Sequence, residues 1–290
     1  MYSAIFDLDP LSILAALLTI LIAVLGLVSN AGVILCFIAD VESRNSFNIV
    51  CLVRAAFNFI CIIFVFVLGM FPTFLLGDSI YSNKVSKAVV VYCMTLSICN
   101  QFFTIFVSIN RFVALYFPTA YNHIFRTHYT VAIIFFITLG RIIWCTDEVV
   151  EYFETGECSI IFDATVLSIT VVPITCMSQN SSALGLAMCF FALVVILNLF
   201  CFVKVFRFYK TFCQDCMGLI DIAFTFKLSS LFVNRFWFFI SNSFVWENVY
   251  AMDGVIMMLF HERWSKLQSR IRSGNTSQVP SSSVKSTFKI

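Results

Sequence analysis

The stretch LSILAALLTILIAVLGLVSNAGVILCFIA, residues 11–39, contains no Asp, Glu, Lys, Arg or His. About 20 predominantly apolar residues in a helix cross the hydrocarbon core of a bilayer, so this run is long enough to span a membrane. It lacks a basic leader and is too long for the core of a signal peptide, so we expect it to be retained. The stretch predicts a membrane-spanning helix.

The composition of the rest of the chain extends this prediction. Hydrophobic residues make up 60% of the 290 residues and charged residues only 12%, whereas soluble domains typically carry about 25% charged residues. Few apolar runs alternate with the two-residue period of a membrane barrel, so helices are expected to cross the bilayer. We predict an all-α membrane protein, a seven-transmembrane helix bundle. Its spans are residues 11–39, 46–71, 87–116, 129–146, 184–206, 214–234 and 236–260.

Lys and Arg are distributed unequally between the two sets of connections. Three of them, Lys84, Lys87 and Arg235, lie on the side of the amino terminus, whereas twelve lie on the other side. Because basic residues are preferentially kept in the cytoplasm, we expect the amino terminus outside and the carboxyl terminus inside. The expected organisation is an extracellular amino-terminal tail (1–10), a seven-transmembrane domain (11–262) and a cytoplasmic tail (263–290).

The segment after the seventh span has a different pattern. In HERWSKLQSRIRS, residues 261–273, Trp264, Leu267 and Ile271 recur at helical spacing with basic residues between them. This pattern predicts a short amphipathic helix on the inner leaflet. The rest of the tail, to residue 290, is rich in Ser and Thr and is expected to be disordered.

Several charged residues lie inside the predicted spans, where each costs roughly 2.5 to 3.5 kcal/mol on insertion scales. Counting residues from the cytoplasmic end of each span places Asn30, Arg54, Asn58, Asp221 and Asp253 at similar depths. We predict that Arg54 pairs with Asp253, helped by Asn30 or Asn58, because an unpaired buried charge is far costlier than a paired one.

A second possible pair, Lys227 and Glu247, lies near the middle of the bilayer. Two interpretations of both pairs remain open. They either only hold the bundle together, or they form a polar switch or a layer that contacts a ligand.

Four motifs carry a resemblance to a known family. They are SINRFVALYFPTAYNHIF at 108–125, NSFNIVCLV at 45–53, CQDCMGLID at 213–221 and FVWENVYAMDGVIMMLF at 244–260. With seven spans, they resemble G-protein-coupled receptors, and most closely the nematode serpentine receptor class x family of chemoreceptors. The resemblance implies a small environmental molecule as ligand, and a heterotrimeric G protein as partner at the cytoplasmic ends of spans three, five and six.

The resemblance also implies roles for individual residues. Arg111 and Asn110, at the cytoplasmic end of the third span, take the place of the G-protein switch, and Asn110 stands where most relatives in the wider superfamily have an acid. The implied location is the plasma membrane of a sensory cell. The connection between spans five and six, 207–213, lacks the basic stretch expected there in relatives.

Depth and polarity predict where the ligand binds. In the outer half of the bundle, the pocket is expected to be bounded by Tyr92, Thr95, Asn100, Lys227, Trp246 and Glu247. Aromatic richness favours an apolar or aromatic ligand. The long outer connection, 147–183, is acidic and has no Lys or Arg, which either assists ligand approach or only suits translocation.

The outer connection also predicts two covalent features. Cys158 and Cys176 are the two cysteines that lie away from the spans, in an oxidising compartment, and we predict a disulfide between them. Asn180 begins the glycosylation sequon Asn-Ser-Ser on the same side. The Cys213 and Cys216 pair lacks the further ligands that zinc needs, so we interpret it as structural.

Other classes of function find less support. The His residues at 123, 128 and 261 lack zinc spacing and no Gly-rich phosphate loop is present, so we expect no enzyme, no metal and no cofactor. The seventh span has no Lys for a retinal Schiff base, and we expect no nucleic-acid partner. An ion channel or transporter remains the alternative, because charged residues could line a polar path through the membrane. These residues are Arg54, Arg141, Lys227, Glu247 and Asp253.

Overall fold

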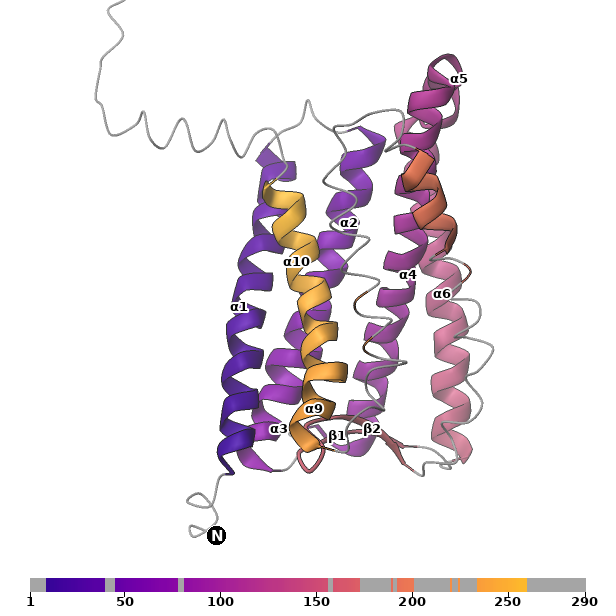
Figure 1. Cartoon of the computed structure of the whole chain (residues 1–290). Helices are drawn as coiled ribbons and strands as arrows, with labels where there is room; N and C mark the ends of the chain where they lie inside the picture. The colour runs from indigo at the N-terminus through magenta and orange to yellow at the C-terminus, as the bar shows by residue number, and fades with distance from the viewer. Residues whose placement is uncertain are drawn as a thin grey trace, which may run out of the picture.

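A computed structural model describes residues 9–39, 45–77, 81–155, 159–172, 189, 192–200, 220, 224 and 234–259. In this part of the chain, long helices run side by side, and a small two-stranded sheet lies across one end of them (Figure 1). We call this the hairpin end. The opposite end, where the short helix α5 lies, is the α5 end.

The helices follow the predicted spans. They are α1 (Pro10–Ala39), α2 (Ser46–Cys61), the π-helix η2 (Ile62–Met70), α3 (Phe71–Leu76), α4 (Asn83–Tyr116), α5 (Pro118–Ile124), α6 (Thr127–Thr155), α9 (Arg235–Phe238), the π-helix η5 (Phe239–Phe244) and α10 (Val245–Leu259). Within the described residues, four helices are long and apolar enough to cross a membrane: α1, the continuous α2–η2–α3 helix, α4 and the first part of α6. The chain is therefore a mostly helical, integral multi-pass membrane protein.

Two helices extend well beyond their predicted spans. The second continues past residue 71 to Leu76, and α6 continues past residue 146 to Thr155. In α6, hydropathy marks the apolar turns and the helix continues into the acidic turns that follow, whereas residues 72–76 of the second helix, PTFLL, are largely apolar themselves. Residues 192–200 are helical, within the predicted fifth span. Most of that span, nearly all of the sixth and the proposed amphipathic helix lie outside the described residues.

Two prolines explain two changes in helix geometry. Proline lacks an N–H and its ring clashes with the carbonyl of residue i−4, so a regular α-helix is disturbed around it. The wider turns of η2 come just before Pro72, and α3 then ends at Gly77, whose φ of +78° favours glycine. Pro118 similarly separates α5 from the end of α4.

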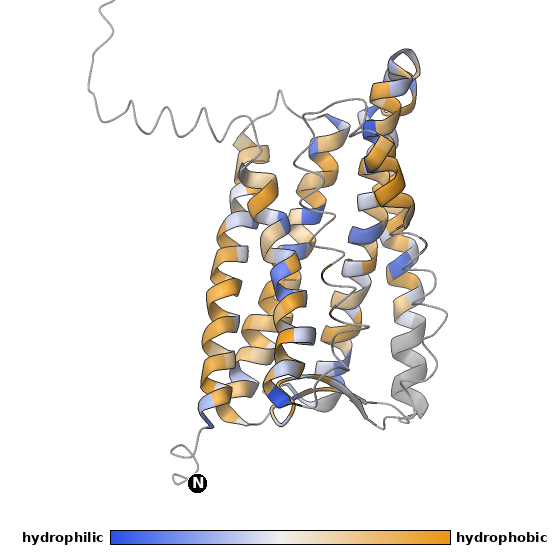
Figure 2. Ribbon diagram, in the orientation of Figure 1, coloured by the Kyte–Doolittle hydropathy of each residue, from blue (hydrophilic) through white to orange (hydrophobic). Residues whose placement is uncertain are grey.

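The packing order follows from the contacts between helices. α1 packs against α10 and α2, α2 packs against α4, and α4 packs against α6. Large apolar side chains such as Leu21, Phe136 and Trp144 remain exposed on the outward faces. These faces are largely orange in Figure 2, as expected for a surface in contact with lipid.

Two glycines allow α1 and α10 to approach closely. A Cβ added to Gly26 would lie 3.1 Å from the Cα of Ala251, and one added to Gly254 would lie 2.7 Å from the Oγ of Ser29. Small residues commonly bring the backbones of membrane helices together in this way. The contact fixes α10 against the first helix.

The prediction of an all-α chain omitted a β-hairpin after α6. Strands β1 (Ser159–Asp163) and β2 (Ser168–Val172) pair antiparallel, with Asp163 opposite Ser168. The Asp163 carboxylate accepts hydrogen bonds of 2.7 Å from both the N–H and the hydroxyl of Thr165, which closes the turn. Part of the acidic connection is therefore folded.

Candidate functional site

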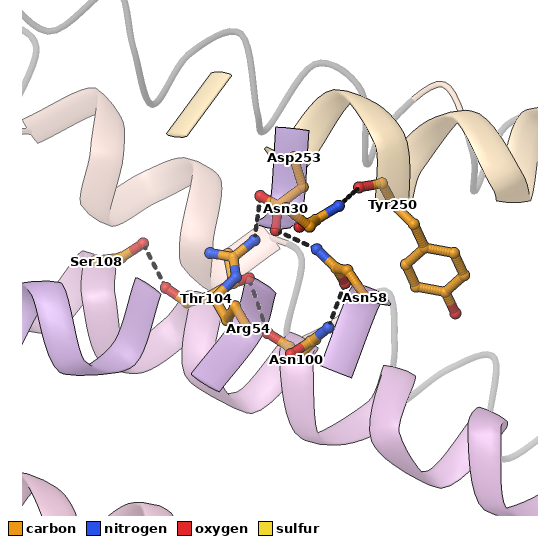
Figure 3. Close-up of polar contacts among 8 residues, drawn as sticks. All are labelled: Asn30, Arg54, Asn58, Asn100, Thr104, Ser108, Tyr250 and Asp253. Carbon is orange, nitrogen blue, oxygen red and sulfur yellow. Dashed lines mark hydrogen bonds and ion pairs between the residues drawn. The ribbon is translucent and has the colours of Figure 1, made fainter. Parts of the chain in front are cut away.

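A buried polar cluster joins α2, α4 and α10 inside the bundle (Figure 3). Arg54 Nη2 donates to Asp253 Oδ1 at 2.7 Å, and Asn58 Nδ2 donates to Asp253 Oδ2 at 2.8 Å. The side chains of Arg54 and Asp253 are only 11% and 8% exposed. The ion pair that depth along the spans predicts is present, and Asn58 assists it.

Two other asparagines extend this cluster in different directions. Asn100, predicted to contact the ligand, donates to Asn58 Oδ1 at 2.7 Å and so belongs to the cluster. Asn30 donates to the carbonyl of Gly26 at 2.8 Å and to the carbonyl of Tyr250 at 3.1 Å. These bonds join α1 to α10 and do not involve Asp253, which Asn30 was one of two residues predicted to assist. Asp221, predicted at the same depth, lies outside the described residues.

A line of hydroxyl groups continues from the cluster along α4. Thr104 donates to the carbonyl of Asn100 at 2.9 Å, and Ser108 donates to the carbonyl of Thr104 at 3.0 Å (Figure 3). Asn198, in the helical segment 192–200, donates to the Ser108 hydroxyl at 3.1 Å. The line connects the middle of the bundle to its α5 end.

Asn110 joins four helices at the α5 end. Its Nδ2 donates to Ser46 at 3.2 Å, and its Oδ1 accepts from the Tyr121 hydroxyl at 3.4 Å. The hydroxyls of Ser46 and Thr130 share a hydrogen bond of 2.6 Å. Asn110 is only 3% exposed, so its amide takes part in the packing of α2, α4, α5 and α6.

Arg111 lies beside this junction and contacts α2. The Cζ of its guanidinium lies 5.0 Å from the centroid of the Phe47 ring, a cation–π distance. Sequence reasoning identified Asn110 and Arg111 but missed Ser46, Tyr121 and Thr130. Tyr121 falls within the 108–125 motif and Ser46 within the 45–53 motif, whereas Thr130 lies in neither.

The hairpin covers the opposite end of the bundle. The Phe162 ring of the hairpin packs directly against Gly69 of η2. A Cβ added to Gly69 would lie 2.5 Å from the nearest ring atom, so the ring fits only because residue 69 has no side chain. Arg235 of α9 contacts the carboxylate of Asp9, the hydroxyl of Ser12 and the carbonyl of Ala164. The hairpin is thereby joined to α9 and to the start of α1.

Glu247 lies about one turn deeper than the hairpin. Ser243, about one turn before it in the chain, donates to the Leu167 carbonyl at 3.0 Å and to the Ser168 hydroxyl at 3.2 Å. Glu247 itself is 1% exposed, and among the described residues neither carboxylate oxygen has a hydrogen-bond partner. Its predicted partner, Lys227, lies outside the described residues.

The other predicted ligand residues have different surroundings. Trp246 packs against Phe66 and Tyr250, with ring centroids 5.3 and 5.7 Å away. Thr95 is buried, whereas Tyr92 is 37% exposed and shares a 3.2 Å hydrogen bond with Thr146 between α4 and α6. The described contacts do not join these residues into a single site.

The predicted covalent features fall outside the described residues, since Cys158, Cys176 and Asn180 all lie there. Within the described part, no group of three or more His, Cys, Asp or Glu could hold a metal ion.

Comparison with known proteins assigns the family. No curated protein matches the chain at a significant level. The family model of the serpentine type 7TM GPCR chemoreceptor Srx matches residues 20–212 and 205–261, well over half of the 290 residues. The chain belongs to the Srx family of serpentine seven-transmembrane G-protein-coupled chemoreceptors.

Proposed function

We propose that this receptor binds a small environmental molecule near its hairpin end and signals to a heterotrimeric G protein at its α5 end. Membership in a chemoreceptor family supports the general function. Membership in a seven-transmembrane family supports seven spans, and the distribution of Lys and Arg supports an orientation with the hairpin end outside and the α5 end in the cytoplasm. The proposed location is the plasma membrane of a sensory cell.

The surroundings of Glu247 support a ligand site at the hairpin end. Among the described residues Glu247 has no cation or hydrogen-bond donor, and buried ionisable residues inside a membrane bundle are usually functional. Glu247 lies below the hairpin, and Trp246 beside it offers an aromatic surface. A ligand that carries a hydrogen-bond donor suits the Glu247 carboxylate.

The line of hydrogen bonds from Asp253 to Ser108 is the observation that carries the proposal (Figure 3). Its bonds from Asp253 to Asn100 join buried side chains, and those of Thr104 and Ser108 go to part-buried backbone carbonyls of α4. It starts on α10, the helix that bears Glu247, and ends two residues before Asn110 on α4. A ligand that binds one conformation of α10 more tightly than another would increase the population of that conformation. The hydrogen bonds that connect α10 to α4 would change with it. Asn110 and Arg111 would then change their contacts with α2.

Expression of the full-length receptor with a panel of volatile and water-soluble odorants tests the proposal. G-protein activation is the readout, and at least one odorant is expected to elicit it. Arg111→Ala should abolish or strongly reduce the response. Arg126→Ala is the matched control, because Arg126 is an exposed arginine at the same end of the bundle. A response of equal size in Arg111→Ala would contradict the proposed switch.

A further inference from the structure

One face of α6 carries a cation among mostly apolar side chains. Ile133, Phe136, Ile143 and Trp144 are exposed on the outward side of this helix. The buried or half-buried residues recur at helical spacing and include Thr130, Ile134, Ile137, Thr138, Arg141 and Cys145. Arg141 therefore lies on the side of α6 that packs against α2 and α4, away from lipid.

The neighbours of Arg141 place it well inside the bundle. Ile134 and Ile137 pack into one apolar cluster with Cys99 and Phe103 of α4. Arg141 follows about one turn later on the same face. Cys99 lies near the middle of α4, far from either end of that helix. The Nε of Arg141 has almost no exposed surface, so this part of the side chain is packed among protein atoms.

Two hydrogen-bond donors on this face have no acceptor. The Nε of Arg141 and the hydroxyl of Thr138 are both buried, and neither has a partner among the residues that the structure describes. Residues three apart in a helix lie on the same face, so these donors are neighbours. Leaving such groups unsatisfied costs free energy, and more for a charged group.

The two helices that pack against α6 offer Arg141 no acidic residue. The ion pairs among the described residues join Arg54 to Asp253 and Arg235 to Asp9. Neither α2 nor α4, which pack against α6, contains Asp or Glu, and the predicted fifth span, 184–206, contains none either. In α6 itself, Asp147, Glu148, Glu151 and Glu154 all lie nearer the hairpin end, and their side chains are outside the described residues. Among the described side chains, α2, α4 and α6 therefore offer Arg141 no anion.

We propose that Arg141 and Thr138 form a binding site for the carboxylate group of an organic acid at the contact between α4 and α6. The planar guanidinium offers paired N–H donors that match two carboxylate oxygens, and the Thr138 hydroxyl adds another donor. One cation balances the single charge of a carboxylate, whereas a phosphate monoester brings about −1.5 to −2. The acid reaches the site either from water or from the bilayer as a fatty acid. This binding does not depend on signalling to a G protein.

Binding of radiolabelled octanoate to the full-length receptor in phosphatidylcholine nanodiscs tests the proposal. Octanoate is expected to bind saturably, and octanamide, which has the same chain but no charge, should compete poorly. Arg141→Gln should weaken octanoate binding by on the order of thirtyfold, the loss typical of removing one partner of a buried charge pair. Arg126→Gln removes an exposed arginine as the matched control and should leave binding unchanged.

A second set of measurements separates binding from folding and identifies the source of the acid. Arg141→Gln removes a charge whose Nε has no hydrogen-bond partner among the described residues, so the apo variant should unfold at a temperature no lower than wild type. Thr138→Val, which keeps the shape of the side chain, should weaken octanoate binding by a smaller factor than Arg141→Gln. A fatty acid that co-purifies with wild type and is lost from Arg141→Gln would identify the bilayer as the source. Reversible octanoate binding without a co-purified acid would identify the aqueous phase. Equal binding of octanoate and octanamide, or unchanged binding in Arg141→Gln, would overturn the proposal.

Discussion

At the scale of single residues, Asp253 uses both of its carboxylate oxygens in the buried cluster, one with Arg54 and one with Asn58. Breaking a buried ion pair typically costs about 3–5 kcal/mol, because the remaining charge is left uncompensated. Asp253→Asn should therefore lower the free energy of unfolding by a similar amount. Chemical unfolding of the purified receptor in detergent micelles measures this change.

A double variant controls for the general effect of mutating the cluster. Arg54→Met combined with Asp253→Asn leaves no unpaired charge, so it should be more stable than Asp253→Asn alone. A double variant that is less stable than the single variant would show that Arg54 and Asp253 do not compensate each other.

Asn110 donates a hydrogen bond to Ser46 of α2 and accepts one from Tyr121 of α5. Loss of its amide should therefore weaken the packing of the helices at the α5 end. We expect Asn110→Ala to raise ligand-independent nucleotide exchange on the G protein. Tyr121→Phe removes only the longer bond, of 3.4 Å, and should have a smaller effect. Basal exchange in membranes that contain equal amounts of each receptor is the measurement, and a fall in Asn110→Ala would refute the role of this contact.

The sequence predicts some of these residues because the rise of a helix per residue is fixed. Counting residues from the cytoplasmic end of each span is enough to place Arg54 and Asp253 at the same depth. It does not show which way a side chain points, and Asn100, expected at the ligand, bonds to Asn58. The contacts of Asn110 with Ser46 and of Ser46 with Thr130 depend on how distant helices assemble, so counting along single spans does not reveal them.

At the scale of elements, the close approach of α1 and α10 depends on Gly254. A Cβ there would lie 2.7 Å from both the Nδ2 of Asn30 and the Oγ of Ser29, so Gly254→Ala should disturb the Asn30 contact with α10. Overpacking of this kind typically costs about 1–3 kcal/mol of stability. Thermal unfolding in detergent measures the effect.

Gly140 of α6 is the matched control for this substitution. Nothing lies within 4 Å of a Cβ added there. Since alanine is a better helix former than glycine, by roughly 1 kcal/mol, Gly140→Ala should be neutral or stabilising. Equal destabilisation by Gly254→Ala and Gly140→Ala would contradict the packing argument.

The hairpin docks through the contact between Phe162 and Gly69. Gly69→Ala should displace the ring and thus loosen β1 and β2, because the added Cβ would overlap Phe162. Faster hydrogen exchange over residues 159–172 would report this loosening. Phe162→Ala in the Gly69→Ala background removes the overlap and should restore part of the protection. Exchange that is the same in Gly69→Ala and wild type would exclude this docking contact.

Hydropathy predicts the long helices because each buries apolar side chains over many turns. It does not predict η2 or η5, whose extra backbone residue per turn leaves composition unchanged. The hairpin was missed for a related reason, since Ser159–Asp163 and Ser168–Val172 are short strands inside a connection that the charge pattern describes only as acidic.

At the scale of the whole molecule, the hairpin and α5 lie at opposite ends of the bundle (Figure 1). The proposed orientation places exposed Thr165 outside the cell and exposed His123 inside. In intact cells, a membrane-impermeant maleimide should label Thr165→Cys above the background of the native cysteines. It should label His123→Cys only after permeabilisation. The reverse pattern would show that the bundle is inverted.

Signal transfer from ligand to G protein is the central claim, and the purified receptor in lipid vesicles tests it most directly. Nucleotide exchange on an added heterotrimeric G protein and ionic current are measured on the same preparation. We predict exchange that increases with an activating odorant and is lost in Arg111→Ala, without ligand-independent current. Ligand-independent current with no nucleotide exchange would contradict the account and favour a channel.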